Sequence, residues 1–322
     1  MSIIIFSENK NGKVKKQSIE AVSFASNISR NISQPVVAIS IGDVSNDELS
    51  VLSEHGADKI ITIKDPKWTV FDTQAYTKLV SEIVEKENAS TIIFSHSNTG
   101  KAIAPRLSVR LKAGLVSGIL GLPVSYSPMV LNRKSYNGAA MQRVSIKSAK
   151  NILTINPNSC EIAKNVKSVN IEEYNPQTDS DFKTKVVEVD IISGKVVLTE
   201  ANIVVSGGRG MKSGDNWKPI EELAELLGAG LGCSRPVSDE GWRSHEEHVG
   251  QTGKIISPDL YIAIGISGAI QHIGGISGSK VIVAIDKDKD APIFKYSDYG
   301  IVADAFEVLP RLIESVKKFK NS

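Results

Sequence analysis

Short apolar runs alternate with amphipathic segments through the first third of the chain. Four apolar runs are typical of buried strands, at residues 3–6, 36–39, 60–63 and 91–94. Between and after them, apolar side chains recur at helical spacing, which predicts helices over residues 18–28, 74–87 and 101–111. This alternation predicts a parallel sheet with helices on both faces.

The pattern changes after Ile119. Residues 142–146 and 151–155 are short alternating stretches, which predict antiparallel strands added to the first domain. Residues 172–185 are polar and contain a proline, which indicates a connecting segment. Residues 186–192 are interpreted as one more strand of the first domain.

A second alternation begins near Val197. It predicts strands at 203–205, 260–264, 281–285 and 300–302, and helices at 217–227, 269–273 and 306–319. We therefore expect an α/β protein of two domains. Residues 1–195 form a parallel-sheet, nucleotide-binding-like domain with added antiparallel strands, and residues 196–322 form a doubly wound domain.

Two glycine-rich and hydroxyl-rich segments flank the predicted strand 260–264. Residues 249–254 read VGQTGK, and residues 265–272 read GISGAIQH. In open α/β sheets, ligands bind at the loops that leave the carboxyl ends of the strands. Glycines let the backbone approach a ligand closely, and the polar side chains among them supply directional hydrogen bonds. These segments predict a phosphate or cofactor site.

Two further turns are weaker signals. Residues 207–214 read GGRGMKSG between a strand and a helix, one residue off the usual dinucleotide fingerprint, so a plain tight turn remains an alternative. Residues 232–236 contain Arg235 before a proline, which could present a cation to a ligand or lie in a surface turn.

The histidines carry little signal by themselves. His272 follows the second glycine-rich turn and either hydrogen-bonds a cofactor carbonyl or has only a water partner. His245 and His248 are three residues apart, whereas the helical zinc motif needs four, so we expect them to be solvated and expect no metal. His96 and Asn98 fit an ordinary polar turn better than a nucleotide loop.

Composition narrows the function class. Lys and Arg total 38 against 36 Asp and Glu, a balance that argues against nucleic-acid binding. Two distant cysteines give no disulfide framework, and no apolar run is long enough for membrane insertion. The N-terminus enters a strand at once, so we expect a bacterial cytoplasmic protein; a mitochondrial matrix location fits less well because no transit segment is seen.

The chain offers many groups for holding a cofactor and few for breaking substrate bonds. It has no nucleophile elbow, no Walker A loop and no obvious acid–base pair, so we predict no catalytic residues. This imbalance is typical of a protein whose cofactor does the chemistry.

Taken together, these stretches resemble the α subunit of electron transfer flavoproteins, the FixB family. The matching runs are VVSGGRG at 204–210, SRP at 234–236, VGQTGK at 249–254, LYIAIGISGAIQH at 260–272, APIF at 291–294 and DYGIVAD at 298–304. They cover most of the second domain in specific order and spacing. The first domain matches more loosely, through NTGK at 98–101 and PR at 105–106.

The resemblance implies FAD in the second domain, with the flavin facing a β subunit and the first domain at the partner interface. Arg209 would lie near the flavin and pyrophosphate. Ser234 and Arg235 would contact the cofactor, with the guanidinium over the ring. Gln251 and Thr252 would hydrogen-bond ribityl and ring atoms, with Thr252 near N5.

On the other side of the cofactor, the resemblance puts Ser267, Gly268 and Gln271 near the phosphates and His272 near the C2 carbonyl. Asp304 would lie on the adenosine side. The full set of implied cofactor-binding residues is Arg209, Ser234, Arg235, Val249, Gly250, Gln251, Thr252, Ile266, Ser267, Gly268, Ala269, Ile270, Gln271, His272, Asp286, Asp304 and Ala305.

One residue departs from the family pattern. The family commonly has asparagine after the strand 281–285, and this chain has Asp286. Aspartate accepts hydrogen bonds from ribose hydroxyls but donates none when ionised, and it brings negative charge close to the diphosphate.

The resemblance implies an electron carrier rather than a conventional enzyme. It would accept electrons from flavin dehydrogenases, such as the acyl-CoA dehydrogenases of fatty acid β-oxidation, and pass them to electron transfer flavoprotein–quinone oxidoreductase. AMP would bind mainly in the β subunit. The alternatives are a self-sufficient NAD(P)-dependent oxidoreductase, a nucleotide-binding sensor, and an electron-bifurcating variant of the same family with a second flavin in the partner.

Overall fold

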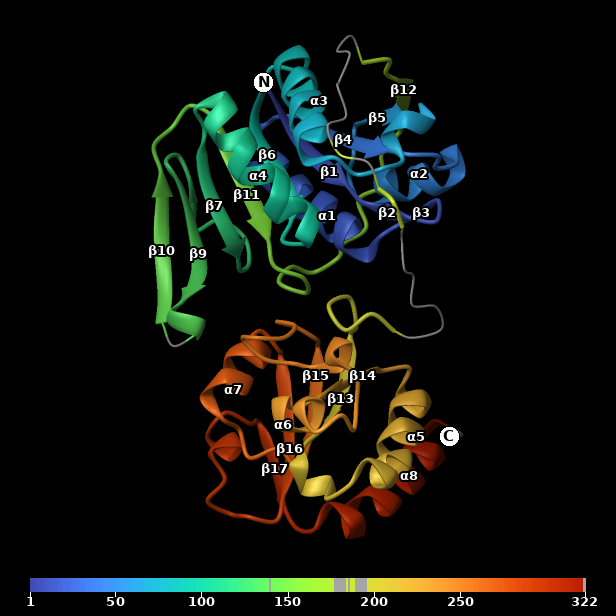
Figure 1. Ribbon diagram of the computed structural model, residues 1–322. Coiled ribbons are helices and arrows are strands. Elements are labelled where there is room, and N and C mark those ends of the chain that lie inside the picture. The colour runs from blue at the N-terminus through green and yellow to red at the C-terminus, as the bar shows by residue number, and fades with distance from the viewer. Residues whose placement is uncertain (139, 177–183, 185, 189–195, 321–322) are drawn as a thin grey trace. The chain divides into compact units, whose positions relative to one another are not determined.

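The chain folds into two compact units, Met1–Asp190 and Ile191–Ser322, in a computed structural model (Figure 1). The structure describes residues 1–138, 140–176, 184, 186–188 and 196–320. Each unit is built on a sheet of its own.

The N-terminal unit has a mixed sheet with a parallel centre. Its parallel strands are β1 (Ser2–Ser7), β4 (Val36–Ile41), β5 (Lys59–Ile63), β6 (Ala89–Ser95), β7 (Gly114–Ile119), β11 (Asn151–Ile155) and β12 (Asn170–Glu173). They lie in the order β7-β11-β6-β1-β4-β5-β12, and each pair of neighbours is parallel.

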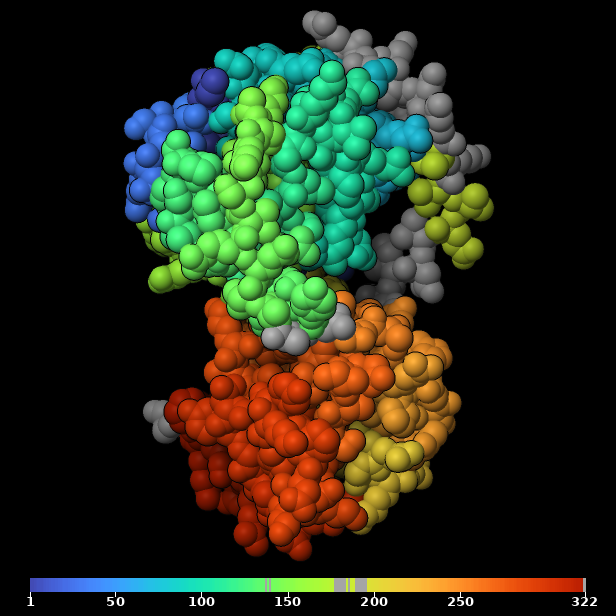
Figure 2. Space-filling model, turned by 90° about the vertical axis from the view of Figure 1, so that its left-hand side faces the viewer, coloured from blue at the N-terminus to red at the C-terminus, as the bar shows by residue number. Residues whose placement is uncertain are grey.

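Antiparallel strands extend this sheet beyond β7. They are β8 (Ser125–Tyr126), β9 (Met129–Ser135) and β10 (Ala140–Ile146), with β9 pairing to β7, β8 and β10. Figure 2 views the N-terminal unit from this side, where the green residues of β9 and β10 form its outer surface. A separate small hairpin joins β2 (Asn9–Lys10) to β3 (Lys13–Val14).

Helices cover both faces of this sheet because β1 is apolar on both sides. Ile3 and Ile5 pack into one core with α1 (Lys16–Ile32) and α2 (Asn46–Glu54). Ile4 and Phe6 pack into the opposite core with α3 (Thr73–Lys86) and α4 (Asn98–Leu111). All four side chains are at most 3% exposed, as expected for the central strand of a parallel sheet.

Several local predictions for this unit are wrong. Residues 151–155 form a parallel strand between β6 and β7, because Ile152, Leu153 and Ile155 are buried in cores on both faces. Helix α4 starts three residues earlier than predicted, since the Ser97 hydroxyl accepts the Gly100 N–H and caps it.

Two segments near the end of this unit also need correction. The predicted connecting segment at 172–185 begins inside β12, which pairs with β5. In the predicted strand 186–192, residues 186–188 have no regular structure, and the rest lies outside the described residues.

The C-terminal unit is a doubly wound parallel sheet, as predicted. Its strands are β13 (Ile203–Gly207), β14 (Gly230–Cys233), β15 (Leu260–Ile264), β16 (Val281–Asp286) and β17 (Tyr299–Val302), in the order β14-β13-β15-β16-β17. Each neighbouring pair is parallel. The connections between these strands contain short 3-10 helices, η3 (Arg209–Met211), η4 (Gly214–Trp217), η5 (His245–Glu247) and η6 (Pro292–Lys295).

The helices of this unit lie on opposite faces of the sheet (Figure 1). Helices α5 (Lys218–Leu227) and α8 (Ala305–Lys320) share one core with Val205, Ile262 and Ile264. Helix α7 (Ile270–Ile276) packs on the other core with Val204, Tyr261 and Ala263. Short helix α6 (Arg235–Asp239) follows β14 directly. No helix within the described ranges is long and apolar enough to cross a membrane.

We predict that burial of His96 makes the N-terminal unit sensitive to acid. Its Nδ1 lies 2.7 Å from the Thr154 hydroxyl oxygen, and burial, followed by the charges of Lys101 and Arg133, lowers its pKa to about 4. Below pH ~6.5 His96 binds a proton in the unfolded chain but stays neutral in the folded chain until the pH nears 4. The free energy of unfolding therefore falls as the pH falls through this range.

The free energy of unfolding should fall between pH 7 and pH 4.5 by roughly 2 kcal/mol less in His96→Gln than in the wild type. Urea unfolding at the two pH values measures this difference, with His245→Gln as the control at an exposed histidine. An equal pH dependence in the wild type and His96→Gln would contradict the prediction.

Candidate cofactor site in the C-terminal unit

The C-terminal sheet reverses its winding direction at β13. The chain passes from β13 to β14 on one side, and then to β15 on the other side. Loops leaving adjacent strands at such a reversal diverge, which leaves a crevice at the carboxyl edge of the sheet.

A cavity of about 590 Å³ lies at this edge. The loops after β13, β14 and β15 contribute to it, as does the last residue of β16. Its lining residues are Arg209, Gly210, Ser234, Arg235, Pro236, Asp239, His248, Val249, Gly250, Thr252, Gly265, Ile266, Ser267, Gly268, Ala269, Gln271, His272 and Asp286.

Glycines bring the turns after β13 and β15 into backbone contact. A Cβ at Gly208 would lie 2.1 Å from the Gly265 carbonyl oxygen, and one at Gly210 would lie 2.7 Å from the Gly265 Cα. The Gly208 and Gly210 N–H groups donate to the Ile264 and Gly265 carbonyls at 2.8 and 3.0 Å. No larger residue fits at these positions without moving backbone.

Residues 249–254 form a strap that is tied to α7. The Gln251 N–H donates to the Gln271 carbonyl at 2.9 Å, and Gly250 N–H donates to the Lys254 carbonyl at 3.1 Å. A Cβ at Gly275 would lie 2.4 Å from the Gly250 Cα, so the two backbones are in contact. The strap therefore closes one side of the cavity.

Two arginines give the cavity positive charge. Arg209 is exposed, and Arg235 Nε donates to Asp239 Oδ2 at 3.2 Å. The Arg235 and Asp239 side chains are 61% and 54% exposed, so this ion pair is weak and leaves the guanidinium available to an anionic ligand.

His272 is held inside the cavity wall by a tyrosine. Its Nε2 lies 2.8 Å from the hydroxyl oxygen of Tyr261, which is fully buried on β15. Its Nδ1 is buried and has no hydrogen-bond partner among the described residues. Burial, with a further contribution from His248, lowers the pKa of His272 to about 4, so the ring is neutral at pH 7.

The structure brings together most of the residues that the sequence predicted. Thirteen of them line the cavity: Arg209, Ser234, Arg235, Val249, Gly250, Thr252, Ile266, Ser267, Gly268, Ala269, Gln271, His272 and Asp286. The sequence-based set omits five lining residues: Gly210, Pro236, Asp239, His248 and Gly265.

Four predicted residues do not line the cavity. Gln251 packs against Gly274, whose Cβ would lie 2.4 Å from its amide nitrogen. Ile270 is 62% exposed, and Ala305 is buried in the core with α8. Asp304 accepts the Phe306 N–H at 2.9 Å and lies 3.8 Å from Lys212 Nζ.

The prediction that His245 and His248 are both solvated is half wrong. His245 is exposed, but His248 is only 7% exposed and lines the cavity. The residue before the strap is drawn inward because it pairs with Cys233 as an isolated parallel bridge at the end of β14. Its neighbour Val249 gave the signal, since an apolar residue beside a glycine-rich strap is typical of a buried segment.

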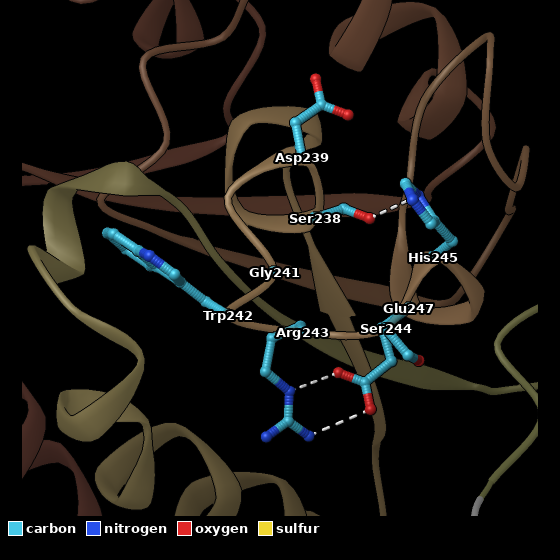
Figure 3. A pocket seen from close by; sticks show the side chains of 8 residues that line it. All are labelled: Ser238, Asp239, Gly241, Trp242, Arg243, Ser244, His245 and Glu247. Carbon is cyan, nitrogen blue, oxygen red and sulfur yellow. Dashed lines mark hydrogen bonds and ion pairs between the residues drawn. The ribbon is translucent and has the colours of Figure 1, made fainter.

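A second hollow of about 580 Å³ adjoins the segment 238–247 (Figure 3). Arg243 donates from Nε and Nη2 to Glu247 at 2.6 and 3.0 Å, and from Nη1 to Glu221 at 2.7 Å. Both carboxylates hold this arginine, so it is not available to a ligand. The role of Arg243 is structural, since its ion pair with Glu221 connects the segment to α5.

Ser238 and His245 form a hydrogen-bonded pair in the same hollow, 2.7 Å apart (Figure 3). The drawn carboxylates do not orient the imidazole, because Glu247 faces Arg243. A serine nucleophile needs a base that is itself oriented, so this pair has no hydrolase geometry. Within the described residues, no cluster of three or more His, Cys, Asp or Glu side chains could hold a metal ion.

The cavity fits a large anionic cofactor. Its glycine turns present backbone at close range, its arginines supply positive charge, and the buried Nδ1 of His272 has no hydrogen-bond partner in the described part of the chain. Its lining includes apolar residues, such as Val249 and Ile266, beside polar ones, as a flat ring with a polar edge requires. The donor set therefore suits FAD.

Comparisons with known proteins agree with the geometry. Residues 197–277 match the profile of the electron transfer flavoprotein FAD-binding domain, and residues 3–180 match the electron transfer flavoprotein domain. The electron transfer flavoprotein subunit alpha of Bacillus subtilis is 39% identical over 98% of this chain and 97% of its own length.

Two more distant relatives have related names. Protein FixB of Clostridium saccharobutylicum is 32% identical over 98% of this chain and 96% of its own length. A probable mitochondrial electron transfer flavoprotein subunit alpha from Caenorhabditis elegans is 35% identical over 97% of this chain and 92% of its own length.

We predict that Gly268→Ala weakens FAD binding at least tenfold. Gly268 has φ +85, and an added Cβ would lie 2.5 Å from the Ile293 backbone nitrogen. The backbone strain costs about 1–3 kcal/mol, and the clash moves the turn that lines the cavity. Fluorescence titration of the flavin-free protein with FAD measures the affinity.

Gly228→Ala is the matched control for this substitution. Gly228 also has a left-handed φ, +61, but nothing lies within 4 Å of its Cβ position at the end of α5. It should lose stability without losing FAD affinity. Equal affinity losses in the two variants would show that strain alone explains the effect.

Proposed function

The chain belongs to the electron transfer flavoprotein α-subunit family, and on that basis we propose that it carries electrons between a dehydrogenase and a quinone reductase. Its C-terminal unit is an FAD-binding domain. We propose further that it pairs with a β subunit, which holds AMP, through its N-terminal unit. The relatives that match it almost end to end are named as α subunits, which supports a heterodimer.

The observation that carries this proposal is a cavity built to hold a cofactor with no substrate-transforming groups beside it. His272 is buried, neutral and tied to Tyr261. Burial, followed by the charge of Glu247, raises the pKa of the Cys233 thiol to about 12, so it is no nucleophile. Bound FAD would supply the redox chemistry, and the protein would supply position and charge.

We assign the lining residues by their chemistry. Arg209 and Arg235 would stabilise the phosphates and the negative charge of a reduced ring. Ser234, Thr252, Ser267 and the strap backbone would hydrogen-bond the cofactor. Gln251, Ile270, Asp304 and Ala305 stay proposed cofactor-binding residues from the family resemblance.

The physiological partners are the finer part of the proposal. We propose acyl-CoA dehydrogenases and related flavin dehydrogenases as donors, electron transfer flavoprotein–quinone oxidoreductase as acceptor, and a place in fatty acid β-oxidation in the bacterial cytoplasm. Family membership supports this assignment. An electron-bifurcating variant would differ by a second flavin in the β subunit.

Co-expression with the β subunit tests the proposal. We expect a yellow heterodimer with one FAD that is reduced by an acyl-CoA dehydrogenase with its substrate and reoxidised by a quinone oxidoreductase. Visible spectra during stepwise reduction and flavin quantification provide the measurement. A colourless protein would contradict the proposal, and two FAD with reduction by NADH would instead identify the bifurcating variant.

Removing the negative charge of Asp286 should tighten FAD binding. Asp286 ends β16 and lines the cavity, where its Oδ1 accepts the Asp288 N–H at 2.9 Å. Asp286→Asn keeps an oxygen acceptor and removes repulsion toward the phosphates. We expect three- to tenfold tighter binding, roughly 1 kcal/mol, and a larger effect at low salt.

Asp288→Asn is the control, because Asp288 is exposed on the same loop and does not line the cavity. It should leave FAD affinity unchanged. Weaker binding in Asp286→Asn would show that the carboxylate is a useful acceptor for ribose hydroxyls.

A further inference from the structure

His248 differs from every other histidine of the chain. The sequence has five histidines, and a ring nitrogen of each of the other four lies within 2.9 Å of a protein oxygen. Within the described part of the chain, the ring of His248 has no such partner. It is nevertheless 93% buried, since only 7% of the residue is exposed. Its ring nitrogens are not among the fully enclosed polar atoms of the described residues, so they keep access to the cavity that the residue lines.

The unpartnered ring lies in the wall of the cofactor cavity. His248 lines it with Arg235 and His272, directly before the strap. Its ring packs against two strap glycines: a Cβ at Gly253 would lie 2.7 Å from its Cγ, and one at Gly250 would lie 3.3 Å from its Nε2. A Cβ at Gly253 would also lie 2.8 Å from its Nδ1, so the strap backbone holds the ring in the cavity wall.

The charged groups around His248 come from several elements. Arg235 and Asp239 belong to α6, His245 to η5 and His272 to α7. The pKa of His248 is lowered first by burial and then by the positive charge of Arg235, whereas Asp239 acts in the opposite direction. In the cofactor-free protein the ring is therefore neutral at pH 7.

The two cavity histidines differ in their capacity to bind a proton. His272 is locked to Tyr261 at 2.8 Å, and its pKa is about 4. In the part of the chain that the structure describes, the ring of His248 has no hydrogen-bond partner that protonation would displace. A nearby negative charge raises the pKa of a histidine, and reduction of the flavin adds such a charge.

We propose that His248 is a further FAD-binding residue that takes up a proton when the flavin is reduced. The inference rests on the proposed function, because that function supplies the electrons. Each electron comes from the donor dehydrogenase, and the proton comes from solvent and binds the free ring nitrogen of His248. The resulting imidazolium offsets the new negative charge, and no hydrogen bond to a described residue has to break.

His248→Gln tests the proposal, with His245→Gln as the matched control. Both replace a histidine of one short segment, but His245 is exposed and does not line the cavity. The heterodimer is photoreduced in weak buffer with a pH indicator between about pH 6 and 8, around the ordinary histidine pKa. We expect the wild type and His245→Gln to take up more protons per flavin than His248→Gln, by up to one.

The midpoint potential gives a second readout. One additional proton changes the reduction equilibrium tenfold per pH unit, which is about 59 mV for a one-electron couple and about 30 mV for a two-electron couple. The potential of the wild type should therefore fall more steeply with pH than that of His248→Gln. Equal slopes and equal proton uptake in all three proteins would overturn the proposal, as would equal changes in both variants.

A measurement on the unaltered heterodimer guards against failure of the variant to fold. Histidine-selective ¹⁵N labelling follows the His248 ring nitrogens in the oxidised and the reduced complex. A shift to imidazolium on reduction supports the proposal, and an unchanged neutral ring overturns it. A protein that binds no FAD would instead refute the proposed function, so the two failures are distinguishable.

Discussion

Backbone contact between two turns is the constraint on which the cofactor site depends. The turns after β13 and β15 touch through Gly208, Gly210 and Gly265, and the Gly208 and Gly210 N–H groups donate to carbonyls across the contact. This contact fixes the direction in which the following loops leave the sheet. Arg209 and Ser267 lie on those loops, and His272 lies in α7, which follows the second loop. The placement of charge and hydrogen-bond donors therefore depends on three positions that carry no side chain.

Most of the fold follows from hydrophobic patterning. The continuous run Ile3–Phe6 predicts a strand covered on both faces, and the structure has one. Residues 151–155 misled the same reasoning because a single threonine makes a buried parallel strand look alternating. Helix α2 escaped detection because it is short, although Ser45 caps it by accepting the Glu48 N–H. The sequence indicates this helix through its capping residues, Ser45 and Glu48, rather than through apolar residues at helical spacing.

The site was predictable where a short run of sequence contains the residue types that bind a cofactor. Glycines next to hydroxyl residues mark a loop that approaches a ligand, and these residues do line the cavity. Asp239 was not predictable, because only the path of the chain after β14 determines that it faces the cavity, and for His248 the apolar neighbour Val249 was a local signal. Conversely, Ala305 directly follows a matching motif but faces the core, which local sequence does not reveal.

The strap has a consequence for how the protein is made. Residues 249–254 belong to no strand of the sheet and are held by Gln271 and Gly275, which follow them along the chain in and near α7. During synthesis the strap therefore has no α7 to pack on until residues 270–276 have been made, so this wall of the cavity closes only after that helix forms. The order of synthesis thus makes the strap one of the last parts of the cavity wall to become fixed.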